Sequence, residues 1–98
     1  MMYLMLWEAD ASALPSDPDE ARKLNQSMRE IVKKNIESGK VKMWGISPEG
    51  LHGFVVRGEE DGKTLLTGSL KRLPYVKRKI MPMLSFDEYM DVMKEMDR

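Results

Sequence analysis

Residues 1–10, MMYLMLWEAD, carry the strongest indication of the fold. Side chains alternate between the two faces of a β-strand, so odd and even positions in this stretch would point in opposite directions. Both sets are apolar, with Tyr3, Met5 and Trp7 on one side and Met2, Leu4 and Leu6 on the other. A strand of this kind needs an apolar cover on each face. The sequence therefore raises the question of what covers the second face of the sheet.

Composition limits the classes of protein. The 98 residues form a single expected domain, residues 1–98, and the 16 basic and 16 acidic side chains cancel. A net charge of zero gives no general attraction to nucleic acid or to an anionic membrane. The chain has no cysteine, which excludes disulfides, thiolate nucleophiles and cysteine metal ligands. The apolar opening is too short for a signal peptide or a membrane span, so we expect a cytoplasmic protein.

A long amphipathic helix is predicted after the first strand. Asp17 is a typical N-cap, Pro18 a typical first helical residue, and Glu20 suits the reciprocal position of a capping box. Gly39 suits the left-handed residue that ends the helix. Apolar residues recur at helical spacing between these ends, at Ala21, Leu24, Met28, Ile31, Val32 and Ile36.

A hairpin, a helix, a strand and a final helix are predicted to follow. Residues 41–46 and 51–57 are β-type runs joined by the turn sequence SPEG. A second helix precedes Pro74, with one proposed apolar stripe made of Leu65, Leu66, Leu70 and Leu73. Residues 75–84 form a fourth strand. The last helix has a capping box of Ser85 and Glu88, and its expected buried residues are Phe86, Tyr89, Met90, Met93 and Met96.

This order predicts an α+β fold, the ferredoxin-like βαββαβ plait with an extra C-terminal helix. Its sheet has four antiparallel strands in the order 4-1-3-2, with helices on one face. The first and third strands would be central. Lysines, Arg78 and Pro82 in the second and fourth strands suit edges, because charge and proline discourage further strand pairing.

The uncovered sheet face predicts self-association. The second strand would place Trp44 and Ile46 against Val41 and Met43, and the third would place Phe54 and Val56 against Leu51 and Val55. Each face of such a sheet measures roughly 350 Å². We expect a homodimer that buries this face, or a higher oligomer. The alternative is a last helix that folds across the same face.

The layout resembles the dimeric α+β barrel superfamily, which includes muconolactone-isomerase-like, antibiotic-biosynthesis-monooxygenase-like and stress-responsive barrel proteins and many small uncharacterised families. The resemblance covers nearly the whole chain and depends on the doubly apolar opening MMYLMLWEAD and the segment IMPMLSFDEYMDVM, with its proline-containing strand before a short acidic helix. No family catalytic motif is present. The resemblance implies a cleft or barrel interior that holds a small hydrophobic molecule.

Few residues suggest catalysis. His52 is the only histidine and thus a weak candidate for a general acid or base, although a half-exposed structural histidine is the simpler interpretation. No metal-ligand spacing occurs, and we expect neither a metal nor another cofactor. Whether the protein is an enzyme stays open at this point.

Aromatic residues are the candidates for ligand binding. Tyr3, Trp7, Trp44 and Tyr75 could line a pocket, and plain core packing is the alternative. Arg57 and Lys79 could neutralise an anionic ligand if they face the open side of the sheet.

Two further functions remain as alternatives to a homodimer that binds a small hydrophobic ligand. One is a cofactor-free monooxygenase or isomerase, as the resemblance implies. The other is an RNA-binding module, because RNA-recognition motifs share the plait and stack bases on aromatics of the central strands. The segment HGFVVRG and Tyr3 only partly match that pattern, so nucleic acid is an unexpected partner.

Overall fold

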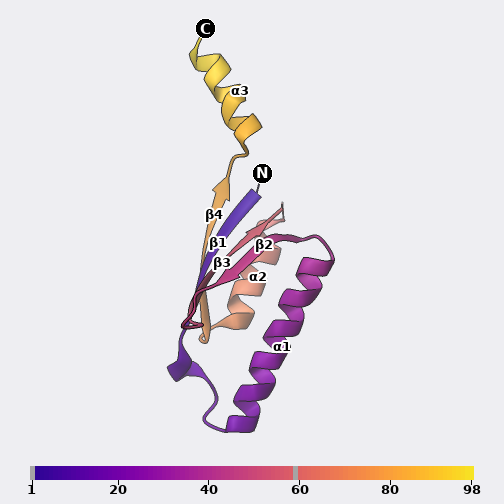
Figure 1. The fold of residues 1–98 in the computed structure, drawn as a ribbon, viewed down its shortest axis with the longest axis vertical. Helices are drawn as coiled ribbons and strands as arrows, with labels where there is room; N and C mark the ends of the chain where they lie inside the picture. The colour runs from indigo at the N-terminus through magenta and orange to yellow at the C-terminus, as the bar shows by residue number, and fades with distance from the viewer. Residues whose placement is uncertain (1, 59) are drawn as a thin grey trace.

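The computed structural model describes residues 2–58 and 60–98 of the chain. Figure 1 shows helices packed on one side of a sheet and the C-terminal helix beyond the end of the sheet. The strands are β1 (Met2–Ala9), β2 (Val41–Ile46), β3 (His52–Arg57) and β4 (Val76–Met83). The helices are the short 3-10 helix η1 (Ala11–Ala13), α1 (Pro18–Glu37), α2 (Gly62–Arg72) and α3 (Phe86–Met96).

The four strands form one antiparallel sheet in the order β2-β3-β1-β4. Read from the β4 edge this is 4-1-3-2, the order expected from the sequence. The strands β1 and β3 are central, and β2 and β4 are the edges; β4, with Lys77, Arg78 and Lys79, is the most charged strand. The fold is therefore α+β with an open four-stranded sheet.

The helices α1 and α2 lie on the same face of the sheet (Figure 1). Helix α1 contacts β2 and helix α2 contacts β4. In the described chain the backbones of α1 and α2 do not approach each other, so the centre of this face is spanned by side chains alone. This separation leaves room for a cavity above the two central strands.

The register of the sheet confirms the two-sided pattern of β1. Met5 lies opposite Val55 and Ile80 on the helix-covered face, and it is the most deeply buried large side chain of the described residues. One prediction for β2 is wrong: a register shift between Val41 and Met43 places buried Val41 on the helix side together with Trp44. Strict alternation could not show this, because a β-bulge inserts one residue into the pattern.

The predicted ends of α1 and of the hairpin are largely confirmed. The carboxylate of Asp17 accepts a hydrogen bond from the backbone N–H of Asp19 at 3.0 Å, so the expected capping box with Glu20 is replaced by a simpler cap. Gly39 closes the helix with φ of +80°, and Gly50 closes the hairpin turn with φ of +83°. Both glycines therefore occupy the backbone region that other residues disfavour.

The predicted apolar stripe of α2 is wrong. Leu65 is buried, but Leu66 and Leu70 are each 59% exposed. The helix instead turns Leu65 and Ser69 toward β4, where Arg78 donates hydrogen bonds to the Leu65 carbonyl and the Ser69 hydroxyl. Hydrogen bonding by a half-buried guanidinium sets the orientation of this helix, and leucine spacing does not.

The prediction that α3 buries its apolar side is also wrong within one chain. The Ser85–Glu88 capping box is present. However, α3 continues beyond the end of β4, contacts no other element of the described chain, and leaves Phe86 71% exposed (Figure 1). The last helix therefore does not cover the open sheet face in this structure.

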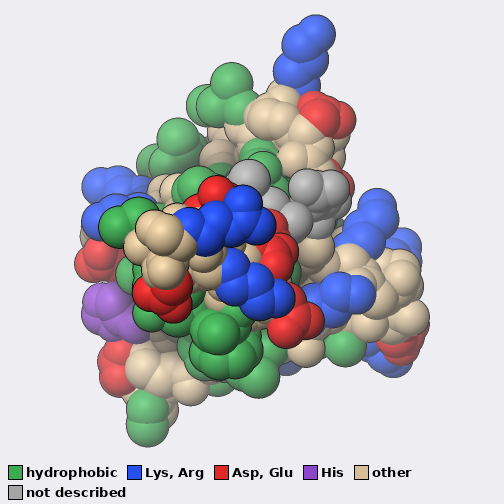
Figure 2. Space-filling model, turned by 90° about the horizontal axis from the view of Figure 1, so that it is seen from above, with side chains coloured by type: hydrophobic (Ala, Val, Ile, Leu, Met, Phe, Trp, Pro, Cys, Tyr) green, Lys and Arg blue, Asp and Glu red, His purple; other side chains and the backbone are tan. Residues whose placement is uncertain are grey.

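The open face of the sheet remains apolar and partly exposed. Met43 is 58% exposed, and Leu6 and Met83 are exposed on the same face. Elsewhere acidic and basic side chains are interspersed, as the view from the α3 end shows (Figure 2). Among the described residues, no helix is long and apolar enough to cross a membrane.

Candidate functional site

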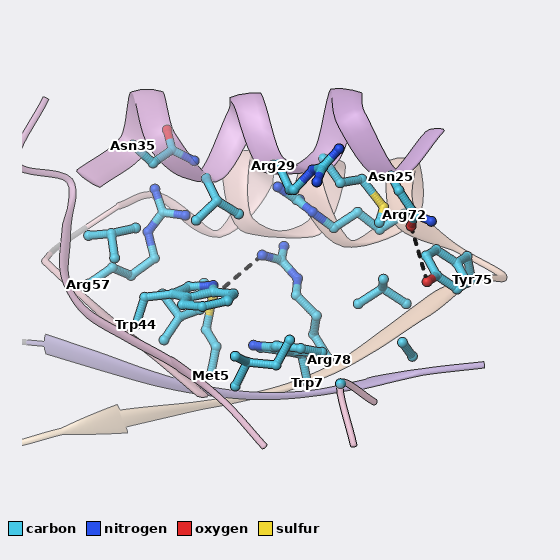
Figure 3. A pocket seen from close by; sticks show the side chains of 18 of the residues that line it. Met5, Trp7, Asn25, Arg29, Asn35, Trp44, Arg57, Arg72, Tyr75 and Arg78 are labelled. Carbon is cyan, nitrogen blue, oxygen red and sulfur yellow. Dashed lines mark hydrogen bonds between the residues drawn. The ribbon is translucent and has the colours of Figure 1, made fainter. Parts of the chain in front are cut away.

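A cavity of about 620 Å³ lies between α1 and the sheet. Its floor comes from the helix-facing side chains of all four strands, and its roof comes from α1 (Figure 3). The apolar part of the lining includes Met5, Trp7, Val32, Val41, Trp44 and Val55. The cavity exists because α1 rests on the edge strand β2 and α2 rests on the opposite edge strand.

Two tryptophans form the aromatic floor of this cavity. The rings of Trp7 and Trp44 stack with centroids 6.1 Å apart and an interplanar angle of 24°. They come from β1 and β2, which both pair with β3, and Gly53 of β3 allows the Trp7 ring to lie close to the backbone. A Cβ atom at Gly53 would lie only 2.3 Å from Cζ2 of Trp7.

The structure brings together three of the four aromatic residues predicted as a ligand site. Trp7, Trp44 and Tyr75 line the cavity, and the Tyr75 hydroxyl donates a hydrogen bond of 3.3 Å to Oδ1 of Asn25 on α1. Tyr3 occupies the same face of the sheet, opposite Arg57 and Pro82, but does not line the cavity.

The sequence singled out Arg57 alone among the arginines of the site and did not predict that the others gather around it. Five of the six arginines of the chain line the cavity, namely Arg22, Arg29, Arg57, Arg72 and Arg78. No aspartate or glutamate is among the described residues that line it. The cavity of a chain with zero net charge is thus strongly basic.

A sequence signal for Arg78 did exist. Val76 and Ile80 are two residues before and after it in β4, so all three share one face of the strand. The sequence predicts Arg78 as an edge charge, whereas it lies half-buried on the helix side. Arg57 also faces the helix side and Lys79 faces the open side, so the condition for these two residues to neutralise an anionic ligand on the open side is not met.

Of Arg57, Arg72 and Arg78, one is paired with a carboxylate and the other two donate to neutral groups. Arg57 forms an ion pair with Glu60, and both side chains are largely buried. Arg72 donates to the Gly68 carbonyl at 2.8 Å, and Arg78 donates to neutral groups, including Sδ of Met5 at 3.4 Å (Figure 3). Within residues 2–58 and 60–98, no carboxylate lies within ion-pair distance of Arg72 or Arg78.

The environment of Arg72 and Arg78 disfavours their charged forms. Burial, reinforced by the charges of Arg72 and Arg57 and opposed by Glu60, lowers the pKa of Arg78 to about 10. Burial and the charge of Arg57 also lower the pKa of Arg72. Both groups stay protonated at neutral pH, so the positive charge in the cavity is retained although its environment disfavours it.

Two buried donors in the cavity lining have no acceptor among the described residues. They are the indole Nε1–H of Trp7 and the Nε–H of Arg57. A buried donor without a partner costs roughly 1–3 kcal/mol. These groups are available to a hydrogen-bond acceptor that enters the cavity.

A second hollow, of about 800 Å³, lies between α1 and α2. It shares Arg57, Arg72 and Arg78 with the first cavity, but it also contains acidic groups and lysines, Glu60, Asp61 and Lys63 among them. Because neither tryptophan lines it, we regard the tryptophan-floored cavity as the candidate site.

His52, the weak catalytic candidate, lies outside both hollows. It is exposed, pairs with Glu8 in the sheet register, and its Nδ1 lies 2.7 Å from Oε1 of Glu49. Its hydrogen bond with Glu49 raises the pKa of His52 above its usual value. Hydrogen bonds from Ser47 and His52 lower the pKa of Glu49 to about 2. The structure does not bring His52 together with the aromatic residues.

No group of three histidine or acidic side chains among the described residues is arranged to hold a metal ion. Comparison with models of known protein families and with curated protein sequences gave no match to this chain. The site is therefore interpreted from its geometry and chemistry alone.

Proposed function

We propose that this protein binds a small, largely apolar ligand in the cavity between α1 and the sheet. The observation that carries the proposal is the stacked pair of tryptophans on the floor of an open space of about 620 Å³. Ligand sites usually measure about 300–1,000 Å³ and combine apolar walls with a few polar groups.

The two tryptophans make the proposal directly testable. They are the only tryptophans of the chain and both line the cavity, so intrinsic fluorescence reports on this site. The neutral aromatic probe N-phenylnaphthylamine should quench this emission and gain fluorescence itself, with saturation at one probe per chain.

A matched pair of variants on α1 locates the probe. Val32→Phe narrows the cavity and should weaken probe binding at least fivefold. Ile36→Phe is the control, because Ile36 is exposed on the same helix and does not line the cavity. Absence of saturable quenching in the wild type, or equal binding by Val32→Phe and Ile36→Phe, would contradict the proposal.

We further propose that the sheet is a ferredoxin-like plait of the dimeric α+β barrel type, with a second copy of the chain as its partner. Support comes from the open sheet face, where Met43, Leu6 and Met83 are exposed, and from α3, which contacts no other helix or strand of the described chain. A chain with few fully buried residues gains stability when such surfaces are covered.

The area of the sheet alone is too small for a stable dimer. Two sheet faces of roughly 350 Å² bury about 700 Å², whereas specific interfaces bury about 1,200–2,000 Å². Helix α3 has 11 residues, so it is about 16 Å long and about 10 Å wide. If each α3 packs beside the sheet contact on the other copy, the two helices and the surfaces they cover add about 640 Å². The total of about 1,340 Å² reaches the required range.

Light scattering tests the dimer. The wild type should have a mass twice that of the 11.3 kDa chain. Met43→Asp on the open face, or Phe86→Ser on α3, should shift it to the monomer, and Leu66→Asp on the outer side of α2 is the control because Leu66 is equally exposed there. A monomeric wild type, or dimers that persist in both Met43→Asp and Phe86→Ser, would refute the proposal that a second copy of the chain is the partner.

The two other functions predicted from the sequence gain less support. RNA-recognition motifs stack bases on aromatics of both central strands, but here Tyr3 and Trp7 of β1 lie on the helix-covered face, which leaves only Phe54 of β3 on the open face of these two strands. For a cofactor-free monooxygenase or isomerase, the single histidine lies away from the cavity. We therefore favour ligand binding over catalysis.

A further inference from the structure

We propose that the ligand of the cavity carries an anionic group, a carboxylate, sulfonate or phosphate, which is bound by Arg57, Arg72 and Arg78. This inference rests on the proposed function and adds the chemical class of the ligand. It makes the site amphipathic, with an aromatic end over the tryptophans and an anionic end at the guanidinium groups.

The charge balance of this three-arginine cluster supports the proposal. Arg57, Arg72 and Arg78 contribute three positive charges, and Glu60, paired with Arg57, contributes one negative charge. The difference, three minus one, leaves two positive charges uncompensated by the described residues in a half-buried space. Burial, and after it the repulsion from neighbouring arginines, lowers the pKa values of Arg72 and Arg78, and a bound anion would offset both effects.

The available hydrogen-bond donors point the same way. The Nε–H of Arg57 and the indole N–H of Trp7 are buried, and neither has an acceptor within residues 2–58 and 60–98. Guanidinium groups present several donors in one plane, which matches the paired oxygens of carboxylates and phosphates. An oxyanion beside Arg57 would therefore satisfy donors that no described residue reaches.

The cluster is also held in place before any ligand binds. Arg78 donates to the Leu65 carbonyl at 3.0 Å and to the Ser69 hydroxyl at 2.9 Å, and this fixes its guanidinium above the sheet (Figure 3). Gly68 leaves space for it, since a Cβ there would lie 3.0 Å from Nη2 of Arg78 and 3.2 Å from Nη1 of Arg72. A preorganised cationic site loses little freedom when it binds an anion.

Two probes that differ by one anionic group test the inference. Anilinonaphthalene sulfonate has the aromatic frame of N-phenylnaphthylamine with an added sulfonate. We expect the sulfonate probe to bind at least tenfold more tightly than the neutral probe, as judged by titration of tryptophan quenching. Its affinity should fall when the salt concentration is raised, whereas that of the neutral probe should not.

Variants of Arg72 assign the effect to the cluster. Its one hydrogen bond in the described chain lies within its own helix, so Arg72→Gln leaves the anchoring contacts of Arg78 intact. The sulfonate probe should bind Arg72→Gln about tenfold more weakly, the size of effect expected for one charged hydrogen bond. Arg72→Lys should retain most of the affinity, and Arg98→Gln, outside the cavity, should behave as the wild type. Thermal unfolding of each variant checks that the fold is kept.

The possible results separate the two proposals. Equal affinity for both probes would overturn the inference that the ligand is anionic, and so would a sulfonate preference that neither Arg72→Gln nor Arg57→Gln changes. Either result would leave the proposal of an apolar ligand in the cavity intact. Failure of both probes to quench the tryptophans overturns the proposed function and this inference together.

Discussion

Replacing Gly53 by alanine tests the packing that creates the aromatic floor. Gly53 lies in the central strand β3, opposite Trp7 of β1 and Ile46 of β2. A Cβ atom built there would lie 2.3 Å from the backbone oxygen of Gly45 and 2.3 Å from Cζ2 of Trp7. Ordinary contacts between such atoms begin near 3.4 Å, so something must move by about 1 Å.

Gly45→Ala is the matched comparison. Gly45 lies in the neighbouring strand β2, and its added Cβ would lie 2.3 Å from Cε1 of Phe54. All three of the nearest atoms there belong to the Phe54 side chain, which can rotate on the open face. At Gly53 one of the obstacles is backbone, which cannot move without disturbing the pairing of β2 with β3.

The expected magnitudes follow from this difference. Overpacking costs about 1–3 kcal/mol, and loss of glycine flexibility in the unfolded chain returns about 0.5–1 kcal/mol. We expect Gly53→Ala to lower the free energy of unfolding by about 2 kcal/mol and Gly45→Ala by less than about 1 kcal/mol. For a domain of this size, about 2 kcal/mol corresponds to a fall in Tm of about 8–16 °C.

Urea denaturation followed by circular dichroism measures the stabilities, and tryptophan emission of the folded proteins reports on the Trp7–Trp44 stack. Gly53→Ala should change the folded-state emission and weaken probe binding, whereas Gly45→Ala should change neither. Wild-type stability in Gly53→Ala, or a larger loss in Gly45→Ala, would refute the placement of Trp7 across Gly53.

Three further predictions concern the polar contacts of the fold. The hydrogen bond with Glu49 raises the pKa of His52, so the stabilisation from this pair is complete below about pH 6.5 and is lost as pH rises through the raised pKa. NMR titration of the single histidine should show the raised pKa, and Glu49→Gln should return the pKa toward its ordinary value. Arg78→Lys keeps the charge but loses the guanidinium hydrogen bonds that join β4 to α2, and should cost about 1–3 kcal/mol in urea denaturation; wild-type stability would show that these bonds contribute little. Ser85→Ala removes the cap of α3 and should cost that helix about 1 kcal/mol, seen as lower helical content by circular dichroism, and unchanged content would contradict the capping role.

The elements of the fold could be predicted from local sequence because their signals are local. Proline and an acidic cap begin α1, glycines end it and close the hairpin, and serine with glutamate begins α3. The alternating apolar residues of β1 likewise predicted a sheet with two apolar faces. Trp7 and Trp44 meet in one cavity because β1 and β2 flank the same central strand, and Tyr75 joins them because it directly precedes β4, which pairs with β1.

The arginine cluster required the tertiary structure. Arg57, Arg72 and Arg78 come from β3, α2 and β4, and each has a plausible local role as a strand end, a helix end or an edge charge. Their shared location follows from the strand pairing and from the rotation of α2, which leucine spacing predicted wrongly. Sequence patterns show which residues are apolar. They do not show which charged residue will be held in a half-buried position by hydrogen bonds.

The order of the elements, most of their caps and the apolar character of both sheet faces follow from local patterns in the chain. Only the folded chain shows that α1 and α2 rest on opposite edges of the sheet and that the space between them is basic. It also shows that α3 does not cover the open face of the sheet of its own chain. The physical reason is range: capping and alternation act over a few residues, whereas the cavity and the charge balance arise from groups up to 73 positions apart, such as Met5 and Arg78.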